Sequence, residues 1–502
     1  MSSLMRKIAA WGWLERVRSL LWTLLLISVP VTSFPYFPEV LGLGGALVRP
    51  LALYPLIILV LIEAMPSLLR SDAIPAAMLP LFGFVLLALV GSFVNLLDAP
   101  FPLGGTTPLS RTIRAYATLG IGLCFLFVCW RMSSREGGIE KASRGLVLGG
   151  AVAVGWGSVQ GLSILTGWPN YEILNILHRS LSVRDMHSLR ATGLAYEPSW
   201  FADFLVVILI PLLIAALISG QRILPGKRWG KIGELALLIA AVINLMMTYS
   251  RGGFIVFLVS MVVIVALEAA SNMGRIRSWF RGEDVGSAGS VERRRTRLVR
   301  GLGSTGGGAL LLMGVSWILS QNVYFKLLWT RLGQISNLVS YFLSIGSGPR
   351  LALWQSALGV FLHRPMLGAG LGLSGFWMWD FLPNWIFNRQ SEILETFTSA
   401  TAGYPNPKNL WIRLLAETGV VGTVLFLAFL LLVALQVFTL YRTRERMGRF
   451  CGIFGMMSLT AIVLEGFSLD SFANPTLWIP LGLILGAMPY VSTITDEEAA
   501  DA

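Results

Sequence analysis

Residues 232–267, IGELALLIAAVINLMMTYSRGGFIVFLVSMVVIVAL, form an apolar run in which Glu234 and Arg251 are the only formal charges. A membrane-spanning helix needs about 20 apolar residues, so this run is long enough for two spans. A guanidinium keeps its charge at ordinary pH, and placing one deep in a bilayer costs roughly a few kcal/mol or more. Arg251 therefore either separates two spans or belongs to a functional site.

The whole chain has the composition of a membrane protein. Of its 502 residues, 55% are hydrophobic and only 13% are charged, which excludes an ordinary soluble enzyme. We attribute the formal net charge of +12 to basic cytoplasmic loops rather than to a nucleic-acid partner. Cys124, Cys129 and Cys451 lie in apolar runs without metal-ligand spacing, as expected for small buried side chains.

About twelve apolar windows are long enough to cross a bilayer. They fall at about 18–34, 46–67, 75–96, 113–130, 145–166, 198–219, 232–250, 252–270, 303–322, 412–439, 450–468 and 474–492. Most of the 39 lysines and arginines then share one side with the N-terminus. The positive-inside rule makes that side cytoplasmic, so we expect both termini in the cytoplasm.

We predict an all-α polytopic membrane protein in which a large, mainly helical periplasmic loop precedes the last three spans. Residues 1–322 would hold nine spans, with a basic cytoplasmic loop near 271–302. Residues 323–411 would form the large loop and 412–492 the last three spans. The acidic end, 493–502, would be a cytoplasmic tail.

The first long outer loop, 167–197, leads into the stretch RATGLAYEPSWFADF (190–204). Pro198 suits the first turn of a helix, and Glu197 would then lie near the positive end of that helix. Arg190 and Glu197 flank a small turn. They form either a structural ion pair or part of a site.

The large outer loop holds more candidate residues. It begins with an amphipathic stretch, 328–344, that could lie flat at the membrane interface. A predicted helix and a glycine-rich turn follow in GSGPRLALWQSALGVFLHRPMLGAGLG (346–372). Arginine suits phosphate because its planar fork pairs two oxygens, so several arginines on one membrane face indicate an anionic headgroup as ligand. The candidates are Arg350, Trp354, His363, Arg364, Lys408 and Asn409.

Other chemistries lack their sequence signatures. The chain has no P-loop, no dinucleotide-binding glycine fingerprint and no Gly-x-Ser-x-Gly elbow. His178 and His187 have no carboxylate pattern that would support a metal site. We therefore expect neither a metal nor a cofactor, and no nucleic acid as partner.

Together these motifs resemble the bacterial O-antigen ligase and O-antigen polymerase superfamily of membrane glycosyltransferases, of the GT-C type. The matching pieces are TYSRGG (248–253), R-x-x-x-W (350–354) with HRPMLGAGLG (363–372), and KNLWIRLLAETGVVG (408–422). The stretch at 190–204 is similar to one common among the polymerases. The resemblance covers most of the chain from about residue 110.

The resemblance implies an enzyme of the bacterial inner membrane that uses neither nucleotide sugar nor metal. It would move a glycan from undecaprenyl diphosphate to an acceptor hydroxyl at the periplasmic face. Two outer arginines bind the diphosphate in the ligases, and they match Arg251 and Arg350. The histidine that is proposed to activate the acceptor there is replaced by Lys408, beside Asn409. Lysine is a poor general base at its ordinary pKa, so we prefer Glu197 as the proton acceptor.

The leading interpretation is polymerisation of lipid-linked repeat units into O-antigen or a related surface polysaccharide. The alternative within the same class is a ligase that transfers the glycan to lipid A core or to protein. A flippase of lipid-linked oligosaccharide is the alternative from another class, but it should show charges within spans and repeated halves. Expected partners are the lipid-linked donor and acceptor, membrane lipid, a flippase and a chain-length regulator. The substrate-binding candidates are Arg190, Trp354, His363, Arg364, Lys408 and Asn409.

Overall fold

A computed structural model gives the structure of the chain. It describes residues 3–36, 48–70, 74–97, 103, 105–226, 228–280, 314, 330, 337–387, 391–398 and 404–488. The predicted span at 303–322, the basic stretch 281–297, the acidic tail and most of the first half of the amphipathic stretch lie outside the described residues.

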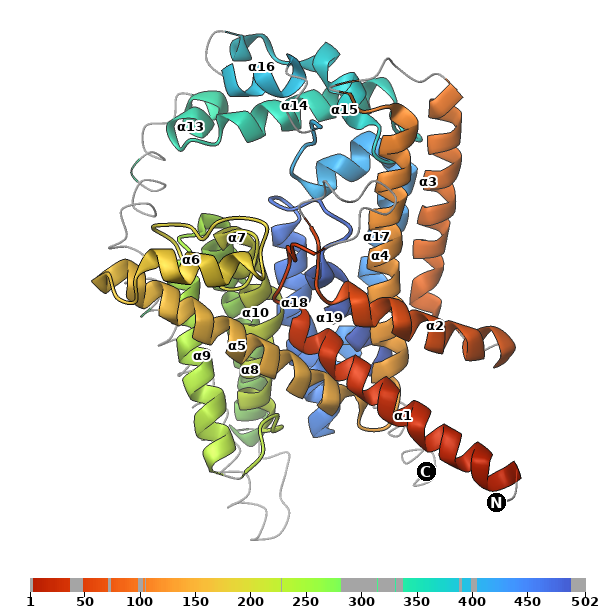
Figure 1. Ribbon diagram of the computed structural model, residues 1–502, viewed down its shortest axis with the longest axis vertical. Helices are drawn as coiled ribbons and strands as arrows, with labels where there is room; N and C mark the ends of the chain where they lie inside the picture. The colour runs from red at the N-terminus through yellow and green to blue at the C-terminus, as the bar shows by residue number, and fades with distance from the viewer. Residues whose placement is uncertain are drawn as a thin grey trace.

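Helices dominate the described chain, which contains two isolated β-bridges and no strand (Figure 1). The first half holds α1 (Ser3–Ser28), α2 (Leu53–Arg70), η2 (Ala76–Met78), α3 (Leu79–Leu97), α4 (Pro108–Ser133), α5 (Gly138–Thr166), α6 (Tyr171–Arg179), α7 (Pro198–Phe204), η3 (Leu205–Leu209), α8 (Ile210–Ser219), α9 (Trp229–Met247) and α10 (Arg251–Phe280). The second half holds α13 (Leu338–Ser344), α14 (Gly348–His363), α15 (Ser374–Trp377), η4 (Met378–Phe381), η5 (Asn384–Ile386), α16 (Ser391–Thr398), α17 (Leu410–Arg442), α18 (Arg446–Glu465) and α19 (Pro475–Gly486).

Eight helical rods in the described residues are long and apolar enough to cross a membrane. They are Ala76–Leu97, Pro108–Ser133, Gly138–Thr166, Pro198–Ser219, Trp229–Met247, Arg251–Ser271, Leu410–Arg442 and Arg446–Glu465. Two shorter apolar helices, Leu53–Ala64 and Pro475–Gly486, coincide with further predicted spans. The prediction of an all-α polytopic membrane protein is confirmed.

One rod, formed by α7, η3 and α8, lies at the centre of the bundle. It is the most buried of the eight, because 89% of its apolar window is covered by other helices. The π-helical turn η3 accommodates Pro211, which has no N–H to donate to the carbonyl of Val207. Ser458 of α18 supplies the missing donor, with its hydroxyl 2.7 Å from that carbonyl. The proline thus ties the central rod to α18.

The residues predicted to lie on the cytoplasmic side and those predicted to lie on the periplasmic side gather at opposite ends of this bundle. Helix α10 begins at Arg251, a predicted outer residue, and Glu268 of the same helix pairs with Arg449, a predicted inner residue, 2.8 Å away. At 1.5 Å per residue the two positions on α10 are about 25 Å apart. We call the end that holds Arg251 the outer end and the end that holds Glu268 the inner end.

The helices of the large loop cover the outer end. Figure 1 shows α13, α14, α15 and α16 together at the outer end, with α15 beside the top of α4. They enclose a small apolar core of their own, separate from that of the bundle. Its buried members are Ala352, Leu353, Ala357, Val360, Ala369, Met378, Leu382, Ile386, Ile393, Phe397 and Ala416. This core fixes α14, and with it Arg350, above the membrane helices.

Candidate functional site

Arg251 is the first residue of α10, directly after a tight break between α9 and α10. Tyr249 has a left-handed backbone with φ of 49°, and the hydroxyl of Ser250 accepts a hydrogen bond from the N–H of Gly253 at 3.3 Å. The break turns the chain and starts the next helix at Arg251. Its Nη1 donates to the carbonyl of Ile345, at the end of α13, at 2.9 Å.

Arg350 lies in the first turn of α14, five residues after that carbonyl, and its side chain is exposed. Its charge acts on the carboxyl group of Glu465, the last residue of α18. Glu465 accepts a hydrogen bond from Ser468 at 2.7 Å, and a Cβ added at Gly252 would lie 3.9 Å from the same hydroxyl. The start of α10, with Arg251, and the first turn of α14, with Arg350, therefore both lie near the outer end of α18, although the two arginines are 99 positions apart in the chain.

The loop before α7 docks on the break that precedes Arg251. The Nε of Arg190 donates to the carbonyl of Thr248 at 2.7 Å, and the next residue bonds Met247 through its backbone. Pro198 occupies the first turn of α7, as predicted, and Glu197 is the N-cap residue. Glu197 pairs with Arg184 at 3.2 Å rather than with Arg190.

Sequence reasoning missed the residue that shapes this loop. Gln160 of α5 is fully buried, and its Oε1 accepts hydrogen bonds from the N–H groups of Thr192 at 3.0 Å and Gly193 at 2.9 Å. Its Nε2 donates back to the carbonyl of Gly193 at 3.1 Å. A polar residue inside a predicted span was the available signal, because such a residue needs a partner.

Lys408 and Asn409 lie at the start of α17, next to the end of α18. Asn409 is buried and caps the helix, since its Oδ1 accepts from the N–H groups of Trp411 and Ile412. The N–H of Leu410 donates to the carbonyl of Gly466 at 2.6 Å. Lys408 is exposed, with φ of 49°. Asn409 thus has a structural role, and Lys408 presents its charge at the same helix end.

Three other predicted residues follow Arg350 along the chain. Trp354, one turn further on α14, packs edge-on against Phe342 at 5.8 Å between ring centroids. His363 ends α14 and is exposed beside Phe381. Arg364 donates to Asn95 of α3 and lies 4.4 Å above the ring of Trp377. These contacts tie Arg364 to α3 and α15, so it holds the outer helices in place.

The glycine-rich turn after Arg364 inserts into a break in α17. Gly419 has φ of 63° and ψ of −167° there, which interrupts the helix. The N–H groups of Ala369 and Gly370 donate to the freed carbonyls of Ala416 and Glu417, at 2.8 and 3.0 Å. In return Val420 donates to the carbonyl of Pro365 at 2.8 Å. This exchange of backbone hydrogen bonds fastens α14 to α17.

A buried ion pair lies on α17 just above that break. Arg413 donates to Glu417 at 3.0 Å and to the carbonyl of Asp470 at 2.6 Å. Ser374 completes the group, since its hydroxyl is 3.1 Å from the second oxygen of Glu417. Arg111 of α4 lies close by, with its guanidinium 4.4 Å above the ring of Tyr404. Sequence reasoning had not singled out any of these residues.

Burial changes the protonation of several groups outside the spans. It raises the pKa of the Asp470 carboxyl, although Arg413 acts in the opposite direction. It also lowers the pKa of His178 to about 4, against the effect of Asp185. His178 therefore stays neutral at pH 7. The ring nitrogens of this fully buried histidine receive no hydrogen bond from the described residues.

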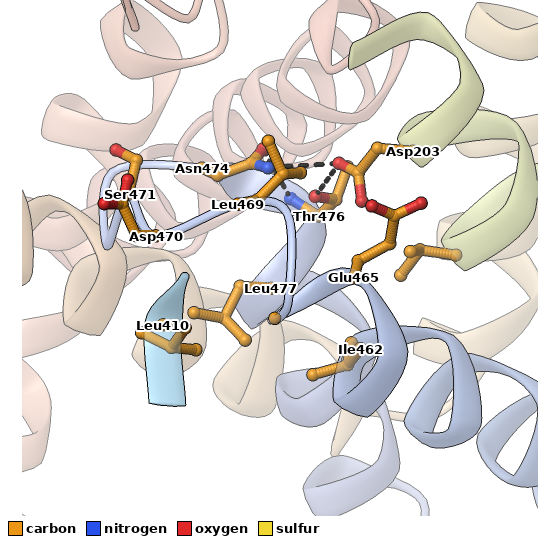
Figure 2. A pocket seen from close by; sticks show the side chains of 12 residues that line it. Asp203, Leu410, Ile462, Glu465, Leu469, Asp470, Ser471, Asn474, Thr476 and Leu477 are labelled. Atoms are coloured by element: carbon orange, nitrogen blue, oxygen red, sulfur yellow. Dashed lines mark hydrogen bonds between the residues drawn. The ribbon is translucent and has the colours of Figure 1, made fainter. Parts of the chain in front are cut away.

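A polar cavity of about 30 Å³ lies beside the end of α18 (Figure 2). Its polar lining comes from Asp203 of α7, Glu465 of α18, and the loop that holds Asp470 and Ser471. Leu410, the first residue of α17, closes the opposite side. This volume suffices for about one or two water molecules. No group of three or more histidine, cysteine or acidic residues in the described chain could hold a metal ion.

Comparison with known proteins agrees with this geometry. Residues 235–427 match the family described as O-antigen ligase, a region that holds Arg251, Arg350 and Lys408 but covers less than half of the chain. A search of curated proteins found none that matches the chain. The match supports a relationship of residues 235–427 to the O-antigen ligase and O-antigen polymerase superfamily.

Proposed function

We propose that the chain is a metal-independent glycosyltransferase that polymerises undecaprenyl-diphosphate-linked repeat units at the periplasmic face of the bacterial inner membrane. The family match supports the general class, a membrane enzyme of ligase or polymerase type. The observation that carries the proposal is the location of both Arg251 and Arg350 near the outer end of α18.

These two arginines have donors to spare for an anionic ligand. A guanidinium has five N–H donors, and Arg251 uses one of them, for the carbonyl of Ile345. Arg350 makes no hydrogen bond to the described part of the chain. Neither one pairs with a carboxylate within 4 Å among the described residues, so both can offer a planar fork to phosphate oxygens.

In the proposed reaction the acceptor hydroxyl oxygen attacks the anomeric carbon of the donor sugar. The bond from that carbon to the diphosphate breaks, and its electron pair goes to the diphosphate oxygen. Fixed cations aimed at this growing charge stabilise the transition state more than the bound donor, which is how they accelerate the reaction. Lys408, exposed at the same helix end, would add a third positive charge.

The reaction also needs an acceptor for the hydroxyl proton. Glu197, the candidate favoured by the sequence, is partly exposed and pairs with Arg184. Its other oxygen accepts a hydrogen bond from Ser199 at 2.5 Å, so both oxygens of this carboxylate already have partners.

Ligation to lipid A core or protein is the second candidate, and the description of the matched family favours it. A reconstitution separates the two. The purified protein in nanodiscs would receive undecaprenyl-diphosphate-linked repeat units, with or without lipid A core. A ladder of longer lipid-linked chains without core supports a polymerase. Transfer that requires core identifies a ligase. If neither mixture shows glycosyl transfer, the proposal is overturned, and a flippase becomes the hypothesis to test.

The proposed sidedness has its own test. A cysteine placed at Ser391, in α16, should react with a membrane-impermeant thiol reagent added to intact cells after the outer membrane is made permeable. A cysteine placed at Ser287 should react only after the inner membrane is opened. The reverse pattern would place the outer end in the cytoplasm and remove the basis for a periplasmic site.

A further inference from the structure

Two carboxyl groups lie buried together at the outer ends of α7 and α18. Asp203 is 3% exposed and Glu465 is 6% exposed. Each has one oxygen satisfied by neighbours, Asp203 Oδ2 by Asn474 at 3.0 Å and Thr476 at 2.5 Å, and Glu465 Oε2 by Ser468 at 2.7 Å. The other oxygens, Oδ1 and Oε1, receive no hydrogen bond from the described residues.

The two carboxyl groups face each other across the edge of the polar cavity (Figure 2). The charge of Asp203 acts on Glu465 more strongly than that of Arg350 does. Two neighbouring buried carboxylates repel each other when both are ionised, so one of them keeps its proton to a higher pH than an isolated carboxyl group does. With that one proton held, the pair still has one ionised carboxylate, which can accept a proton.

The cavity places this pair beside the proposed diphosphate site. Arg350 acts on Glu465 from α14, and Arg251 starts α10, where a Cβ added at the next residue, Gly252, would lie 3.9 Å from the hydroxyl of Ser468. The cavity has room for a hydroxyl group or a water molecule. Asp470 and Ser471, which line the cavity, are partly exposed.

We propose that Glu465, paired with Asp203, is the group that takes the proton of the acceptor hydroxyl. The inference rests on the proposed function, in which the general base for the acceptor hydroxyl is not assigned, and it identifies that base. As the acceptor oxygen bonds to the anomeric carbon, its O–H bond breaks and the proton moves to the free oxygen of Glu465. The electron pair of the donor's carbon–oxygen bond leaves with the diphosphate. The pair, now neutral, later returns the proton to water.

Asp203 also has a structural role, so a substitution there is a less specific test of the inference than one at Glu465. Its Oδ2 binds Asn474 and Thr476, and the side chain of Asn474 caps the first turn of α19. Asp203 thus joins α7 to α19, and its loss would combine chemical and structural effects. Among the described residues, the Glu465 carboxyl group is hydrogen-bonded by Ser468, so a glutamine there keeps the shape and removes the base.

The test compares Glu465→Gln with the unchanged protein in nanodiscs, by the rate of glycosyl transfer and by the affinity for undecaprenyl diphosphate. Loss of a general base lowers turnover by about 10²- to 10⁴-fold. We expect a loss in this range with unchanged affinity, and partial recovery in Glu465→Asp. Glu234→Gln is the matched control, because Glu234 is a buried carboxylate at the inner end that accepts two backbone hydrogen bonds.

Two results would overturn the inference. One is near-normal turnover of folded Glu465→Gln. The other is a loss of the expected size in Glu197→Gln together with normal turnover in Glu465→Gln, which would assign the proton to the loop before α7. An absence of glycosyl transfer by the unchanged protein counts against the proposed function instead, so the two failures are distinguishable.

A second variant keeps the inference testable if Glu465→Gln does not fold. Thr476→Val removes the hydroxyl that binds Asp203 and keeps both carboxyl groups. In the described chain, the charged groups around the pair are Arg350 from α14 and Asp470 before α19. Both stay in place. We expect the acid limb of the pH–rate profile to move to higher pH, because one donor that favours the ionised form is lost. An unmoved profile contradicts the inference.

Discussion

Arginines at the two ends of the bundle have different partners. At the inner end, Glu63 of α2 receives Arg18 at 2.6 Å and Arg135 at 2.9 Å, and Glu268 receives Arg449 at 2.8 Å. At the outer end, Arg251 binds a backbone carbonyl and Arg350 is exposed. These three inner arginines are paired with carboxylates of the protein. Arg251 and Arg350 are not paired with a carboxylate of the described chain, so their charge is available to a ligand.

The difference separates structural from functional cations. A charge held at depth needs an opposite charge, because burial without one costs several kcal/mol. Arg413 shows that the outer end can also meet this need, since it pairs with Glu417 and is buried. The absence of such a partner for Arg251 and Arg350 in the described chain is therefore a property of these two positions. It fits a site whose counter-charge arrives with the substrate.

The largest effect on stability should come from the inner end. Glu63→Ala removes the buried partner of the buried Arg18 and leaves the exposed Glu15 as its remaining carboxylate in the described chain. Breaking a buried pair in this way costs about 3–5 kcal/mol. The thermal midpoint in detergent should fall, while transfer per folded molecule stays normal. Glu15→Ala is the control, because Glu15 meets the same two arginines from an exposed position and is worth about 0–1 kcal/mol. Equal effects of the two variants would mean that the inner cluster does not stabilise the fold.

A smaller loss is expected at the break in α17, which holds the outer helices. A Cβ at Gly419 would lie 2.2 Å from the carbonyl of Met366, in a left-handed backbone. Gly419→Ala should destabilise the protein by about 3 kcal/mol, from backbone strain and overpacking together. Gly105→Ala is the matched control, since Gly105 has φ of 73° with open space around it, and should cost about 1–2 kcal/mol. Thermal melting of both variants decides whether the close packing adds to the strain.

The smallest effect should come from a change that preserves charge at the outer end. If Lys408 binds phosphate, Lys408→Arg keeps the cation, and its turnover should stay within about tenfold of that of the unchanged protein. A tenfold change in rate corresponds to about 1.4 kcal/mol in the activation free energy. Lys408→Ala should lose more. A different role would be evident if arginine were as inactive as alanine and histidine restored transfer, since Lys408 would then occupy the position of a base.

Local patterns in the sequence predicted the membrane helices and the break at Arg251. Both signals are local, because an apolar run long enough for a span and the glycines after Arg251 lie within about 20 residues of each other. The start of α10 and the place of Pro198 in the first turn of α7 were therefore predicted correctly. An ion pair was one of two alternatives for Arg190 and Glu197, and the docking of this loop brings Arg184 to Glu197 instead. That choice depends on contacts with α5 and α9, which the local sequence does not contain.

The polar cavity could not be predicted for the same reason. Asp203 and Glu465 lie 262 positions apart in the sequence, and each is a single carboxylate at the edge of an apolar run. A single carboxylate at such a place does not by itself indicate a functional site. Only the packing of α18 against the central rod brings them together. The glycine-rich turn at 368–372 was expected as a turn, but its insertion into α17 requires the break at Gly419, far along the chain.

The most direct test of the central claim is the turnover of Arg251→Ala on a lipid-diphosphate-linked donor, measured on purified, folded protein. Removing an electrostatic donor of this kind costs about 3–4 kcal/mol, so the account predicts a loss of about 10²- to 10³-fold. Arg442→Ala is the control, because Arg442 is an exposed arginine at the inner end that lies 4.1 Å above the ring of Phe438, and it should lose little. Near-normal turnover of Arg251→Ala would contradict the account and leave this arginine as an anchor of the break between α9 and α10.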